Sequence, residues 1–155
     1  MRRISLIVCS LVLLSLPAAA QTADRKVITL DGAKAILAAA EAEAAKNKWT
    51  VAIAVVDESG NLIAFHKLDD TQMGSIDIAI GKARTAARMK RPTKALEDAV
   101  AGGRTVMLAV EGITPLEGGV PVLLDGRVIG AVGVSGVTSQ QDAQVAQAGA
   151  AALKK

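Results

Sequence analysis

The chain has 155 residues, 51% hydrophobic and 21% charged, with 18 basic and 15 acidic side chains. This near balance, with one tryptophan and one phenylalanine as the only aromatics, gives no support for a nucleic-acid partner, which needs a basic surface and stacking side chains. The single cysteine, Cys9, lies within the first 20 residues, so the remainder can form neither a disulfide nor a cysteine-ligated metal site.

Residues 1–20 have the pattern of a secretory signal peptide. Two arginines precede an apolar run at residues 4–16, and three alanines ending at Ala20 provide a cleavage site. The run is shorter than the ~20 residues that a membrane-spanning helix needs. We therefore expect a mature domain of residues 21–155, periplasmic or secreted, with no membrane span after cleavage.

The segment after the predicted cleavage site reads as a helix followed by a β-hairpin. Apolar residues recur at helical spacing over residues 29–48, which predicts an amphipathic helix. Residues 50–56 are rich in β-branched side chains, Asp57 and Gly60 bracket a tight turn, and residues 61–68 form the return strand.

The middle of the chain is predicted to contain two helices and a further strand. The first helix covers residues 75–92, with Ser75 as its N-cap and Pro92 as its end. A short helix follows at residues 93–103 and stops at two glycines. The composition of residues 105–110 then predicts a strand.

The C-terminal part is predicted to be a loop, a second hairpin and a closing helix. The loop at residues 111–121 contains two prolines and three glycines. Asp125-Gly126 is a strong two-residue turn signal for a hairpin over residues 120–135, and residues 138–155 are helical. The whole pattern predicts one α+β domain: an antiparallel sheet of about five strands with helices on both faces.

His66 is the sharpest candidate ligand, because it is the one histidine in the sequence. It alternates with Leu62, Ala64 and Leu68 and so shares an otherwise apolar strand face. Two interpretations stay open: a satisfied or half-exposed histidine near a strand end, or an axial ligand to haem iron, which imidazole suits.

A charged flank of the second helix is a candidate anion site. Helical spacing puts Asp77, Gly81, Arg84 and Arg88 on one side. One interpretation is a solvated face with intrahelical ion pairs. The other is a binding flank, in which Gly81 leaves room for a flat ligand and the two guanidinium groups hold carboxylates.

Gly118 and Gly119 make the loop before the second hairpin a third candidate. Such glycines let a backbone approach another group closely or reach unusual dihedral angles, and Pro115 and Pro121 stiffen the loop. The loop is either a plain connection between strands or a functional loop on a rigid scaffold.

Five segments together resemble the GlcG/HbpS family, which includes the haem-binding C-terminal domain of PduO-type proteins. They cover nearly all of the mature chain and are VAIAVVDESGNLIAF (51–65), SIDIAIGKARTAA (75–87), RPT (91–93), GGVPVLLDGRVIGAVGVSG (118–136) and QDAQVAQAGAAAL (141–153). Two positions depart from the family pattern. His66 stands where the family usually has an arginine or similar residue, and Val137 stands in place of a further glycine.

The resemblance implies a profilin-like fold, homo-oligomers that are often octamers, and haem as a cofactor in several members. Some members are described as haem-degrading or as extracellular haem-responsive partners of sensor kinases. The family is therefore specific for fold and broad for function.

From the residues and the resemblance we predict an exported homo-oligomer that binds haem for sensing, storage or degradation. Apolar walls would hold the macrocycle, Arg84 and Arg88 its propionates, and His66 its iron. Asp77 lies on the same flank as the arginines, and the loop at Gly118 and Gly119 would approach the flat ligand.

Two other functions are compatible with the sequence. The first is a haem-free oligomeric interaction module that partners a sensor protein or an enzyme. The second is an enzyme that binds a small acid, with Asp77 or Asp142 as base and Arg84 as carboxylate clamp.

Overall fold

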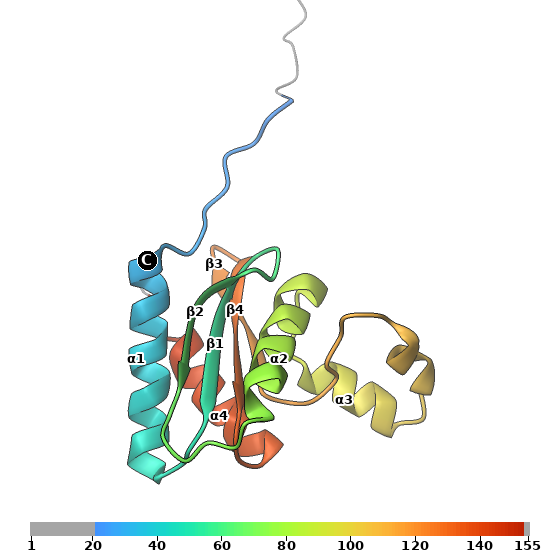
Figure 1. Ribbon diagram of the computed structural model, residues 1–155. Coiled ribbons are helices and arrows are strands. Elements are labelled where there is room, and N and C mark those ends of the chain that lie inside the picture. The colour runs from blue at the N-terminus through green and yellow to red at the C-terminus, as the bar shows by residue number, and fades with distance from the viewer. Residues whose placement is uncertain (1–20, 154–155) are drawn as a thin grey trace, which may run out of the picture.

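The computed structural model describes residues 21–153, so the predicted signal peptide at residues 1–20 lies outside the described part. A four-stranded antiparallel sheet lies between helices on both faces (Figure 1), which confirms the α+β class. Within residues 21–153, no helix is both long and apolar enough to cross a membrane.

The elements follow in chain order as α1 (Leu30–Asn47), β1 (Ala52–Asp57), β2 (Leu62–Lys67), α2 (Ser75–Met89), α3 (Lys94–Ala101), the 3-10 helix η1 (Thr105–Ala109), β3 (Gly119–Leu124), β4 (Arg127–Ser135) and α4 (Ser139–Ala150).

Local signals in the sequence explain where the main helices begin and end. The Thr29 hydroxyl accepts a hydrogen bond from the Gly32 amide, 3.1 Å away, and caps α1. Thr138 and Gln141 form a reciprocal capping box at the start of α4. Ser75, expected as the N-cap of α2, is instead its first residue and is buried, because the N-cap position falls on the preceding glycine.

The strand order is β2-β1-β4-β3, and every neighbouring pair is antiparallel. The two central strands are buried along almost their whole length. Helices cover both faces of these strands, and this explains why the strands carry apolar side chains on both sides and do not alternate between apolar and polar residues. The outer strands β2 and β3 are partly exposed.

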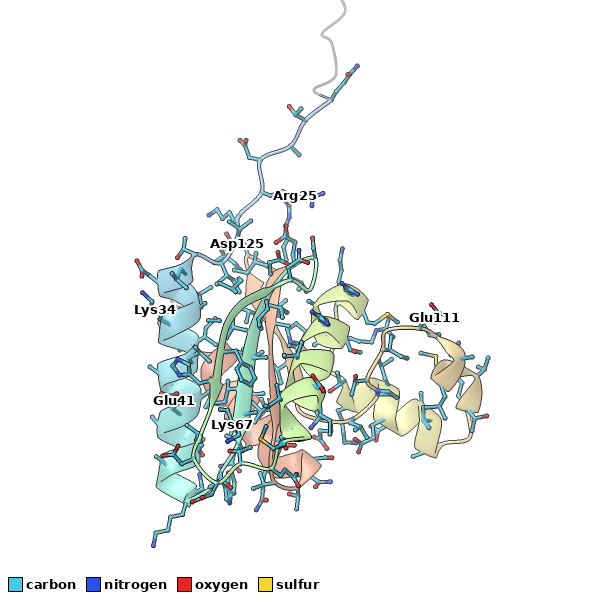
Figure 2. All side chains as sticks on the ribbon, viewed as in Figure 1. Arg25, Lys34, Glu41, Lys67, Glu111 and Asp125 are labelled. Atoms are coloured by element: carbon cyan, nitrogen blue, oxygen red, sulfur yellow. The ribbon has the colours of Figure 1, made fainter. Side chains whose placement is uncertain are left out.

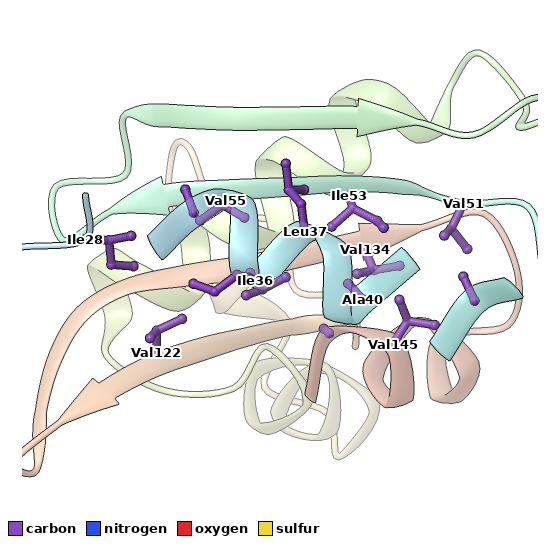
Figure 3. Packing of buried hydrophobic residues seen from close by; sticks show 14 of the residues in the cluster. Ile28, Ile36, Leu37, Ala40, Val51, Ile53, Val55, Val122, Val134 and Val145 are labelled. Atoms are coloured by element: carbon purple, nitrogen blue, oxygen red, sulfur yellow. The ribbon is translucent and has the colours of Figure 1, made fainter. Parts of the chain in front are cut away.

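The two faces of the sheet are packed by side chains of different size. Helices α1 and α4 cover one face with large aliphatic side chains, and Figure 3 shows Ile36 and Leu37 of α1 against Ile53 and Val55 of β1. The other face packs α2 through alanines. A Cβ at Gly133 would lie 2.1 Å from the Ala79 carbonyl oxygen, so α2 lies on the sheet at close range.

The predicted fifth strand is wrong. Residues 105–109 form the 3-10 helix η1, which lies outside the sheet, and none of its side chains is buried. A β-branched composition indicates side chains that fit a pleated surface, but a strand forms only where a neighbouring strand is available. The described chain therefore has four strands and not five.

Candidate functional site

His66 lies on the face of the sheet that α1 covers. It pairs in register with Ile53, whose side chain belongs to the core under α1 and α4, and directly opposite residues point to the same face. Its Nδ1 contacts Oε1 of Glu41, which α1 carries alongside β2 (Figure 2). The His66 side chain is 53% exposed and that of Glu41 is 33% exposed.

This pairing orients the imidazole ring. A carboxylate that accepts a hydrogen bond from Nδ1 fixes the tautomer and the orientation of the ring. The lone pair of Nε2 then points away from the carboxylate, which is the usual arrangement in histidines that bind metals. Ala38 and Ala45 lie one turn to either side of Glu41 on α1, and both are exposed. Small apolar side chains therefore flank Glu41 along this side of α1.

Glu41 was not among the residues singled out from the sequence. It stands in an alternation of alanine and glutamate on α1 that predicts only a solvated helix face. Its partner lies 25 residues away on β2, and a contact of that separation has no local sequence signal.

Arg84 and Arg88 lie together, as the helical spacing predicts, but they face the β1–β2 turn. Nε of Arg84 donates to the Gly60 carbonyl at 3.2 Å, and Nε of Arg88 donates to the Ser59 carbonyl at 2.8 Å. Gly60 has φ +87°, and a Cβ there would lie 2.8 Å from Arg88 Nε. Within the described residues, neither guanidinium is paired with a carboxylate.

The arginines and His66 are on opposite faces of the sheet. Phe65, the neighbour of His66, packs with the alanine cluster under α2, and successive strand residues point to opposite faces. One subunit therefore cannot offer His66 to the iron and Arg84 with Arg88 to the propionates of the same macrocycle. Asp77 lies exposed in the first turn of α2.

The expected space beside Gly81 is filled. A Cβ at Gly81 would lie 2.3 Å from Oγ1 of Thr114, and the Thr114 amide donates to Oγ1 of Thr85 at 2.7 Å. The glycine lets the loop after η1 approach α2, so the flank has no room there for a flat ligand.

Gly118 and Gly119 are buried and approach the protein's own backbone. A Cβ at Gly119 would lie 2.4 Å from the Lys82 carbonyl oxygen. The Gly119 amide donates to Oγ1 of Thr93 at 2.9 Å, and the Gly119 carbonyl accepts from the Thr93 amide at 3.0 Å. Gly118 has φ +123° and lies between Lys82 and Asp142.

Lys82 and Asp142 form a buried ion pair between α2 and α4. Nζ of Lys82 lies 2.8 Å from Oδ2 of Asp142 and 3.0 Å from the Val134 carbonyl oxygen. Each of the two charged side chains is 3% exposed. Burial raises the pKa of Asp142, and the hydrogen bond from Lys82 opposes this increase. No substrate reaches this carboxylate, so the structure gives no support to Asp142 as a catalytic base.

Among the described residues, neither a cavity nor a cluster of metal-binding side chains adds to the site predicted from the sequence. One cavity among the described residues lies at the two hairpin turns and includes Glu58 and Arg127, but it contains none of the site residues predicted from the sequence. In residues 21–153, no three histidine, cysteine or acidic side chains gather as a metal site.

Comparison with known proteins gives a consistent result. Residues 28–151 match the family model for haem-degrading HbpS-like proteins. GlcG of Escherichia coli K12 is 50% identical over 109 residues, which are 70% of this chain and 81% of GlcG.

Two solved structures of similar proteins have the same fold. A double mutant of Streptomyces reticuli HbpS superposes with a TM-score of 0.80 at 33% identity, covering 91% of this chain and 99% of that one. The haem complex of PduOC superposes with a TM-score of 0.74 at 28% identity, covering 83% and 96%.

Proposed function

The chain belongs to the family of haem-degrading HbpS-like proteins, and from this premise we propose that it is an exported protein that binds haem as a homo-oligomer. The observation that carries the proposal is the Glu41–His66 pair. The pair provides an oriented imidazole next to the helix that carries the exposed Ala38 and Ala45, in a chain whose fold resembles that of a haem complex.

The residues at this surface fit a haem iron. Imidazole is a common axial ligand of haem, His66 is the one histidine of the sequence, and the Glu41 carboxylate contacts its Nδ1 and so leaves Nε2 available to a metal. In this role His66 binds the iron, Glu41 holds the ring, and the exposed alanines of α1 allow a flat group to lie against the helix. Any redox chemistry would come from the cofactor itself.

A haemin titration of the chain from Gln21, followed by absorbance in the Soret region, tests this proposal. We expect saturable binding that His66→Ala changes and that Glu41→Gln weakens by about 10- to 100-fold, the usual cost of losing such a partner. Lys67→Ala is the matched control, because it alters the next exposed residue of β2 and should leave binding unchanged.

The possible outcomes separate the parts of the proposal. Saturable binding that is the same in His66→Ala keeps haem but removes His66 as the ligand. No saturable change at micromolar protein refutes haem binding, and the haem-free interaction module then becomes the better function. Export is tested independently by sequencing the N-terminus of the secreted or periplasmic protein, which we expect to begin at Gln21.

A further inference from the structure

The cavity at the two hairpin turns is large enough for an organic molecule. It has a volume of about 990 Å³ and lies between the segment before α1, the β1–β2 turn, the C-terminal end of α2 and the β3–β4 hairpin. Cavities that hold small organic ligands have volumes of about 300–1,000 Å³. Neither His66 nor Glu41 lines it, so the cavity is distinct from the surface proposed for haem.

The inner wall of this cavity is apolar. Ala87 of α2 is fully buried, Ile129 of β4 is 4% exposed, and Leu124 and Val128 are half-buried. Leu123 of β3 continues the wall outward and is 59% exposed. A ligand with an apolar body would remove this surface from water, which is favourable in proportion to the area covered.

Basic side chains surround the apolar wall, and most of them have no carboxylate partner. Four of them line the cavity: Arg25, Lys26, Lys90 and Arg127. Figure 2 shows Arg25 and Asp125 at this end of the molecule. Nζ of Lys26 lies 3.7 Å from Oδ2 of Asp125. Among the described residues, the other three basic side chains form no ion pair.

Positive charge is concentrated at this end of the protein. Arg88 adds a fifth cation, because its Nε donates to the carbonyl of Ser59, which also lines the cavity. Three acidic residues offset part of this charge: Asp24, Glu58 and Asp125. Residues 21–153 as a whole carry 14 basic and 15 acidic side chains. The surroundings of the cavity are therefore basic in a chain that is otherwise slightly acidic, and they favour an anion.

We propose that this cavity binds an organic anion with an apolar body, such as a medium-chain carboxylate. The apolar body packs against Ala87, Val128 and Ile129, and the anionic group is held by Lys90 and Arg127. An arginine and a carboxylate form strong, charge-assisted hydrogen bonds. An inorganic anion would leave the apolar wall in contact with water, and an uncharged apolar ligand would desolvate unpaired cations.

Isothermal titration calorimetry of the chain from Gln21 with decanoate tests this site. We expect saturable binding of one decanoate per chain. Decan-1-ol has the same apolar body without the charge, and inorganic phosphate has the charge without the apolar body. Each should bind at least about ten-fold more weakly, because each loses one of the two contributions.

Two variants locate the decanoate, and each has a matched control. Lys90→Glu with Arg127→Glu should weaken decanoate binding by about ten-fold or more, whereas Lys34→Glu with Lys67→Glu changes the net charge equally and should have no effect. Leu123→Asp should also weaken binding. Its control is Leu108→Asp, because Leu108 is 61% exposed and lies outside the cavity.

Several results would overturn the assignment. They are the absence of saturable decanoate binding, equal affinity for decan-1-ol or phosphate, and wild-type affinity in either cavity variant. Thermal melts followed by circular dichroism check folding, and if the double variant does not fold, Leu123→Asp at its exposed position decides the question.

The decanoate site and the haem site are distinguished by exchanging their variants. His66→Ala should bind decanoate as the wild type does, and a weakened affinity would place decanoate at His66 and overturn the assignment to the cavity. Lys90→Glu with Arg127→Glu should keep the haemin titration of the wild type. A protein that binds no haemin but binds decanoate in the cavity would refute the proposed function and leave this site intact.

Discussion

Replacing Lys82 by methionine should destabilise the protein more than any exposed substitution. The change leaves Asp142 buried without its cation, which lies 2.8 Å away in the folded protein, and both side chains are 3% exposed. Breaking a buried ion pair by removing one partner costs about 3–5 kcal/mol. With a urea dependence of about 2 kcal/mol/M, the unfolding midpoint should fall by about 2 M at neutral pH.

The loss of folding stability in Lys82→Met should depend on pH, and the burial of Asp142 determines in which direction. Burial raises the pKa of this carboxyl, and the hydrogen bond and charge of Lys82 lower it, so the pKa rises further in the variant. The folded variant then holds a proton that the unfolded chain releases, and its stability decreases as pH rises through that interval. The deficit should therefore be largest at neutral pH and shrink as the solution is acidified toward the ordinary carboxyl range.

Two further variants serve as controls for this prediction. Lys82→Met combined with Asp142→Leu should recover most of the loss, because an apolar pair of similar volume replaces a buried ion pair at little cost. Lys34→Met removes an exposed ion pair with Asp31 and should move the midpoint little. A Lys82→Met deficit below about 1 kcal/mol, or one that stays constant with pH, would refute the argument.

Three other substitutions have definite expected effects on stability, each measured by urea unfolding. Gly133→Ala places a Cβ 2.1 Å from the Ala79 carbonyl oxygen and should cost at least about 1–3 kcal/mol; a neutral result would mean that α2 moves away from the sheet freely. Thr138→Ala removes the cap of α4 and should cost about 1 kcal/mol, whereas an unchanged midpoint would show that the cap contributes nothing. Gly60→Ala combines φ +87° with a contact to Arg88; we expect a loss of about 1–2 kcal/mol, and stability equal to the wild type would contradict the strain.

The sequence was a good guide to the body of the fold, because local signals coincide there with tertiary structure. The hairpin around Asp125-Gly126 and the closing helix appear where the turn signal and the helical pattern put them. The same signals failed at residues 105–109, where β-branched side chains occur in η1. No local pattern indicates whether a neighbouring strand is available.

The candidate site was less predictable than the fold, since it depends on which elements face one another. His66 was proposed as a ligand from its residue type, and its contact with Glu41 of α1 had no signal in the sequence. Arg84 and Arg88 were correctly grouped by helical spacing, yet the face of the sheet that they occupy is a property of the topology. Gly119 was recognised as a point of close approach, and only the packing identifies Lys82 as the group approached.

The hydrogen bonds between Thr93 and Gly119 have a consequence for how such proteins diverge. They hold the two ends of residues 94–118 together, so the start of β3 is positioned by its own contacts and not by the length of this segment. Replacing 25 linking residues by about five changes the entropy of closing the loop by only about 1.4 kcal/mol. Residues 94–118 can therefore change in length or sequence at little cost to the sheet that they connect to α2.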